Sequence, residues 1–65
     1  RNRPLDFAAL EVQLKSLGAV RYNAHVFQFN VAPYEMMIFP DGRAIIKGTN
    51  DPGVARSLYA RYIGA

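Results

Sequence analysis

The stretch 34–47, YEMMIFPDGRAIIK, sets two short runs of apolar and β-branched residues on either side of a turn. Asp41-Gly42 is a strong β-hairpin signal, because these residues accept the positive φ angles that connect right-twisted strands tightly. We therefore predict two antiparallel strands, over residues 34–39 and 43–47, joined at this turn.

The turn leaves two strand registers open. A two-residue loop pairs Phe39 with Ala44, whereas a three-residue loop with a bulge shifts the first strand by one residue and exchanges its faces. In both registers Ala44 and Ile46 lie on the more apolar face of the hairpin. The opposite face then carries Arg43, Ile45 and Lys47. The first strand adds to that opposite face either Tyr34, Met36 and Ile38 or Glu35, Met37 and Phe39.

A period of two continues upstream of the hairpin. Between residues 25 and 31, aromatic and apolar residues alternate with polar ones, which predicts a half-buried strand. Residues 20–24 begin this strand or lead into it, and Pro33 fits the turn that follows, because proline cannot donate to a central ladder. The polar side of the strand adds Gln28 and Asn30 to the face opposite the apolar one.

Helical patterns flank the strands. Residues 7–17 repeat apolar side chains at spacings of three and four, which predicts a helix with Asp6 as N-cap and Gly18 in a left-handed conformation after its last turn. Near the end of the chain, Asp51-Pro52 is typical of an N-cap followed by proline at the first helical position. A second amphipathic helix then extends to Gly64. Its apolar face contains Val54, Leu58 and Tyr62.

These elements predict an α+β fold for one small domain over residues 1–65. The order is helix, three-stranded antiparallel meander, helix, in two layers with both helices on one face of the sheet. The other face of the sheet lacks cover, with an apolar centre and a rim of basic and amide groups. We predict that this face docks on another protein surface through Arg43, Ile45, Lys47, Gln28 and Asn30.

Length and composition exclude several classes of function. The 65 residues contain no cysteine, which excludes disulfides, thiolate zinc sites and cysteine nucleophiles, and favours a cytoplasmic location. The net charge of +3 is spread along the chain, a pattern more typical of solubility than of a nucleic-acid surface. No apolar run approaches the roughly 20 residues that span a bilayer, so we expect no membrane contact.

Patterns that carry chemistry are sparse. No glycine-rich phosphate-binding loop occurs, and His25, the only histidine, has no partner suited to metal binding or proton transfer, so we interpret it as structural. Tyr59 and Tyr62 lie beside Arg56 and Arg61, a combination that suits base stacking and phosphate binding, but the rings fit better as packing on the sheet. We therefore predict no catalytic, cofactor-binding or metal-binding residue in this chain.

Five short motifs carry a likeness to a known family. They are Phe39-Pro40-Asp41-Gly42-Arg43, Lys47-Gly48-Thr49, Asp51, Ala55-Arg56-Ser57-Leu58-Tyr59 and Tyr62-Ile63-Gly64. Through them, the run 37–64 resembles the C-terminal end of bacterial adenylyltransferases of the ThiF, MoeB and HesA type, which are relatives of the ubiquitin-activating enzymes. The residues before this run fit the family more loosely.

The resemblance implies a longer parent enzyme that uses ATP and magnesium, and in which paired cysteines bind zinc. Such an enzyme adenylates the C-terminal glycine of a ubiquitin-like sulfur carrier protein in thiamin or molybdenum-cofactor synthesis. The family's catalytic, ATP and zinc residues have no counterpart in this chain. The resemblance therefore implies a C-terminal accessory domain that is not an enzyme by itself. Its partners would be the adenylation domain of the same polypeptide, the carrier protein, or both.

Two alternatives stay open at this point. The order of helix, three strands and helix is similar to that of the double-stranded-RNA-binding domain, but residues 47–53 hold one lysine and one acid where that domain has a basic cluster. Nucleic acid is therefore a disfavoured partner. The other alternative is a free-standing protein-interaction domain.

Overall fold

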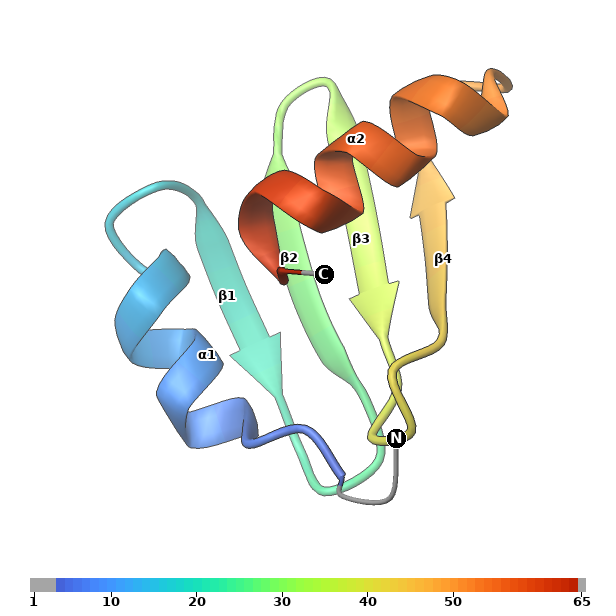
Figure 1. Cartoon of the computed structure of the whole chain (residues 1–65). Coiled ribbons are helices and arrows are strands. Elements are labelled where there is room, and N and C mark those ends of the chain that lie inside the picture. The colour runs from blue at the N-terminus through green and yellow to red at the C-terminus, as the bar shows by residue number, and fades with distance from the viewer. Residues whose placement is uncertain (1–3, 65) are drawn as a thin grey trace.

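A computed structural model describes residues 4–64 as a four-stranded antiparallel sheet with two helices (Figure 1). The elements in chain order are α1 (Phe7–Leu14), β1 (Ala19–Tyr22), β2 (Phe27–Val31), β3 (Tyr34–Ile38), β4 (Ala44–Lys47) and α2 (Pro52–Tyr62). Sequential strands are neighbours throughout, so the sheet is a meander in the order β1-β2-β3-β4. Both helices lie over the same face of the sheet, as Figure 1 shows. The predicted α+β class and two-layer arrangement are confirmed.

The sheet has one strand more than the three that we predicted. Asn23 is the physical reason, because its side-chain Oδ1 accepts hydrogen bonds from the backbone N of His25 at 2.7 Å and of Val26 at 3.1 Å. This Asx-type turn reverses the chain between residues 19–22 and β2. Residues 19–22 therefore form a separate strand that pairs antiparallel with β2. His25 consequently lies exposed in the turn and not in a strand.

The β3–β4 hairpin adopts the three-residue loop with a bulge. The backbone N of Gly42 donates to the Phe39 carbonyl at 2.9 Å, and the backbone N of Phe39 donates to the Arg43 carbonyl at 2.8 Å. Gly42 takes a φ of +95°, the left-handed conformation that this bulge requires. Ile38 therefore pairs with Ala44, which places the even-numbered residues of β3 on the helix-covered face.

The first helix is shorter than predicted, and Gly18 has a different role. Helix α1 ends at Leu14, and Leu17, predicted on its apolar face, is 55% exposed. Gly18 does not adopt a positive φ. A Cβ atom at Gly18 would instead lie 2.4 Å from the carbonyl oxygen of Asn30, so glycine allows the chain to approach β2 closely where β1 begins. The helix ends early because the chain must leave it to bring Gly18 next to Asn30, where β1 begins to pair with β2.

The core lies between the helices and the sheet. Its buried side chains are Phe7, Leu10, Leu14, Phe27, Phe29, Met36, Ile38 and Leu58. From α1, the ring of Phe7 lies 5.5 Å from that of Phe27, and from α2, the ring of Tyr62 lies 5.1 Å from that of Phe29. The Gln13 side-chain amide donates to the Tyr62 carbonyl at 3.0 Å, which joins the two helices directly.

The predicted caps are confirmed at three helix ends. The Asp6 side chain accepts from the backbone N of Ala9 in α1, and the Asp51 side chain accepts from the backbone N of Gly53 in α2. Gly64 has a φ of +99° just after α2. Neither helix within residues 4–64 has the length and apolarity that crossing a membrane requires.

Candidate docking surface

The sheet face turned away from the helices carries two rows of side chains that cross all four strands. The first row contains Arg21, Gln28, Met37 and Ile45, and the second contains Ala19, Asn30, Glu35 and Lys47. We call these eight residues the open face. The residues that alternate with them along each strand face the helices, since successive side chains of a strand point to opposite faces.

The open face is apolar around Met37 on β3 and Ile45 on β4, and we call this part its apolar half. Ile45 is 49% exposed and pairs with the half-buried Met37 on the neighbouring strand. Phe39 follows Met37 by two residues and continues this side of the strand, where the guanidinium carbon of Arg43 lies 5.8 Å from its ring centroid. The large exposed Ile45 makes this half a candidate for burial against a second surface.

Most of the remaining open-face residues are polar, and we call this part the polar half. Arg21, Gln28, Asn30 and Glu35 line a shallow depression of about 380 Å³. Glu35 stands directly opposite Lys47 on β4, and such cross-strand pairs of opposite charge are favourable by about 0.2–1 kcal/mol. The open face therefore presents hydrogen-bonding groups beside its apolar half.

The structure brings together four of the five predicted docking residues and sets the fifth at the margin. Gln28, Asn30, Ile45 and Lys47 all belong to the open face. Arg43 precedes β4, is 79% exposed along its side chain, and donates from Nε to Asp41 Oδ2 at 2.7 Å. This internal ion pair reduces the charge that Arg43 presents to a partner.

The sequence analysis did not place Arg21 on the docking surface, and it did not decide which face of its strand carries Glu35. Arg21 belongs to the open face because it pairs with Gln28. The sequence signal for this strand was Asn23, a residue typical of turns, which could have indicated a separate strand before it. Glu35 depends on the hairpin register, which the bulge at Gly42 determines. The open face therefore carries one basic and one acidic residue beyond the five predicted docking residues.

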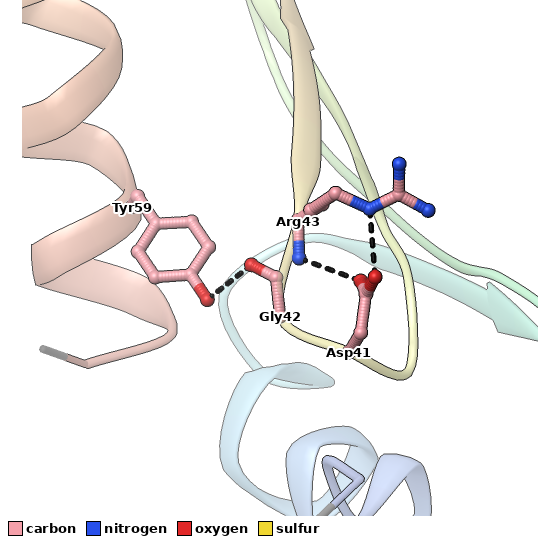
Figure 2. A network of polar contacts seen from close by, with 4 residues as sticks. All are labelled: Asp41, Gly42, Arg43 and Tyr59. Atoms are coloured by element: carbon pink, nitrogen blue, oxygen red, sulfur yellow. Dashed lines mark hydrogen bonds and ion pairs between the residues drawn. The ribbon is translucent and has the colours of Figure 1, made fainter. Parts of the chain in front are cut away.

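The Asp41 carboxylate has a local structural role in the hairpin. Its Oδ1 accepts from the backbone N of Arg43 at 3.0 Å. This backbone hydrogen bond is the main reason that the pKa of Asp41 is lowered, and the side-chain contacts with Arg43 act in the same direction. Figure 2 shows both contacts at the tip of the hairpin.

The motifs that carry the family resemblance build contacts between elements. The Tyr59 hydroxyl in α2 donates to the Gly42 carbonyl at 2.7 Å (Figure 2). Gly48 has a φ of +107°, and a Cβ atom there would lie 2.5 Å from the Pro33 carbonyl in the β2–β3 turn. Thr49 Oγ1 accepts from the backbone N of Asp51 at 3.0 Å, which positions the α2 N-cap. These five motif residues thus serve the fold.

The described residues offer no cluster that suits the metal ions which the resemblance implies for a parent enzyme. Within residues 4–64 there is no group of three or more His, Cys, Asp or Glu side chains that could hold a metal ion. The positive-φ glycines of this part of the chain, Gly42, Gly48 and Gly64, belong to turns and a helix end.

Comparison with curated proteins finds that the chain is similar to part of an adenylyltransferase. This protein is the sulfur carrier protein ThiS adenylyltransferase of Bacillus subtilis (strain 168), a relative that is 40% identical over 60 residues. The match covers 91% of this chain but 18% of the relative, so the chain spans about a fifth of the relative's length. No family model and no solved structure matches the chain. This similarity supports the resemblance read from residues 37–64, as a relation to part of such an enzyme.

Proposed function

We propose that this chain is an accessory domain of an adenylyltransferase that activates a ubiquitin-like sulfur carrier protein, and that its open face docks on the adenylation domain of the same polypeptide. The observation that carries the proposal is the match of nearly the whole chain to a small part of a ThiS adenylyltransferase. ATP, magnesium and zinc would be bound by the rest of that polypeptide, which we expect in the cytoplasm.

The size of the open face favours a tethered partner over a free one. Four strands about 4.8 Å apart, each about five residues long, present roughly 300 Å². A stable interface between separate proteins buries about 800 Å² on each partner. A short linker can supply an effective concentration of about 1 mM, which compensates for a weak contact. The adenylation domain of the same polypeptide is therefore a better occupant than a separately diffusing carrier protein.

The side chains of the open face indicate which groups the docking surface of the adenylation domain would carry. An apolar patch would cover Met37 and Ile45, while acidic groups would reach Arg21 and Lys47 at the two ends of the face. Amide or backbone groups would pair with Gln28 in the polar half. Charge complementarity of this kind speeds the formation of a contact more than it raises the affinity.

The first experiment determines whether the chain exists within a longer protein. Immunodetection with an antibody against this domain, followed by intact mass spectrometry of the native protein, is expected to find a species several times longer than 65 residues that contains a glycine-rich ATP loop. A native species of only this length would contradict the accessory-domain proposal.

The second experiment tests the docking surface in that longer protein. Ile45→Asp places a charge in the apolar half of the open face, and we expect faster hydrogen exchange in the surface it covers together with slower carrier adenylylation. Val12→Asp is the matched control, because Val12 is 69% exposed on α1 in the opposite layer. Equal behaviour of the two variants would exclude the open face as the docking surface.

A further inference from the structure

A second candidate site lies in the helix layer, on the other side of the domain from the open face. A groove of about 420 Å³ runs along one flank of α2, beside Tyr34 at the start of β3. Figure 1 shows α2 crossing β3 in the half of the sheet nearer the β2–β3 turn. The volume is within the range of about 300–1,000 Å³ that ligand sites in proteins occupy.

The groove combines an apolar floor with polar groups. Tyr34, Val54 and Leu58 supply the apolar side chains, and Ser57 lies in the middle of the helix flank. The serine belongs to one of the motifs that resemble the adenylyltransferase family. Ser57 is exposed on this flank of the helix, so its hydroxyl is accessible to an incoming ligand.

Opposite charges stand at the two ends of the groove. Asp51 lies at the N-terminal end of α2, and Arg61 lies about 15 Å away, because ten helical residues rise about 1.5 Å each. The guanidinium carbon of Arg61 is 6.0 Å from the Tyr62 ring centroid, and within the described residues it forms no ion pair. The Arg61 end therefore attracts an anionic group, while Asp51 repels one from the other end.

We propose that this α2 groove binds an extended peptide segment that carries apolar side chains and ends in an acidic residue. Five extended residues span about 16 Å, close to the separation of about 15 Å between Asp51 and Arg61 along the helix. Alternate side chains of such a segment face the groove, so apolar residues at its first and third positions reach the floor and an acidic residue at the fifth reaches Arg61. The Ser57 hydroxyl is placed to pair with the segment's backbone. This site is independent of the docking proposal, since it uses none of the open-face residues.

The test is a titration of the ¹⁵N-labelled 65-residue chain with the peptide acetyl-Leu-Ala-Leu-Ala-Glu-amide, followed by NMR. We expect saturable shifts at the amides of Val54, Ser57 and Arg61, with a dissociation constant on the order of 1 mM. The same peptide with Gln in place of Glu is expected to bind about fivefold more weakly, because it lacks the charge that Arg61 attracts. This comparison leaves the protein unaltered, so it does not depend on the folding of any variant.

Matched charge reversals locate the contact on α2. Arg61→Glu is expected to weaken binding of the Glu peptide at least about fivefold. Arg56→Glu makes the same change on the same helix at an exposed residue outside the groove, and is expected to leave binding unchanged. Shifts confined to the open face, equal binding of the Glu and Gln peptides, or equal loss in both variants would each overturn the α2 groove as an acidic-peptide site.

Discussion

The hydroxyl of Tyr59 donates a 2.7 Å hydrogen bond to the carbonyl oxygen of Gly42, which lies 17 residues earlier at the tip of the β3–β4 hairpin. This bond joins the C-terminal helix to the hairpin whose register determines the open face. The Gly42 Cα faces the same hydroxyl, and a Cβ atom there would lie 3.6 Å from it. The position of α2 and the register of β4 are therefore linked by one side chain.

Tyr59→Phe is expected to lower the free energy of unfolding by about 1 kcal/mol, because it leaves a part-buried carbonyl without its partner. Urea denaturation measures the change. Tyr22→Phe is the control, since its hydroxyl donates a longer bond of 3.3 Å to Glu11 in an exposed position, and we expect a loss below about 0.5 kcal/mol. Equal losses would mean that the Gly42 contact adds no stability.

Gly48→Ala is expected to destabilise the domain more than Gly64→Ala. Both glycines have a positive φ, which costs an alanine about 1–2 kcal/mol. At Gly48 the new Cβ would also lie 2.5 Å from the Pro33 carbonyl, whereas no atom lies within 4 Å of a Cβ at Gly64. Thermal unfolding of both variants gives the difference, and identical midpoints would contradict the close approach.

Met36→Ala and Met37→Ala test the hairpin register directly. Met36 is fully buried, so its truncation is expected to cost about 2–5 kcal/mol. Met37 is half-buried on the open face, and we expect its truncation to cost less than about 1 kcal/mol. The opposite order in denaturant unfolding would indicate the two-residue loop that exchanges the faces of β3.

Acid is expected to weaken the hairpin through Asp41. The folded state lowers the pKa of this carboxyl below its ordinary value of 3.8, mainly by the hydrogen bond from the Arg43 backbone N. A lowered folded pKa means that the stabilisation is present above the unfolded pKa and is lost as the pH falls through the folded value. Unfolding midpoints measured between pH 6 and pH 2 should therefore fall less in Asp41→Asn than in the wild-type chain. Parallel curves would exclude this contribution.

The elements that follow strong local chemistry were predictable from the sequence. Asp6 and Asp51 identify the helix starts, and Asp41-Gly42 identifies the hairpin, because each side chain or glycine satisfies a nearby backbone requirement. The end of α1 was not predictable in this way. Leu17 continues the helical pattern, but the helix stops because Gly18 must approach Asn30 in β2, and that contact is a tertiary one.

The candidate docking surface was predictable only in part, for a related reason. A single-residue shift in register exchanges the faces of β3, and the sequence alone does not determine whether the loop has two or three residues. Lys47 lies on the same face in either register, whereas Glu35 does not. The α2 groove gave no sequence signal, because it arises where Tyr34 comes next to a helix that begins many residues later.

The two rows of the open face have an approximate twofold relation. Turning the face by half a revolution exchanges Arg21 with Lys47, so a partner that senses only positive charge meets nearly the same pattern in both orientations. The same turn exchanges Ile45 with Ala19, which differ greatly in size. Long-range attraction would thus bring a partner to this face without aligning it, and the bulk of one isoleucine would select the orientation.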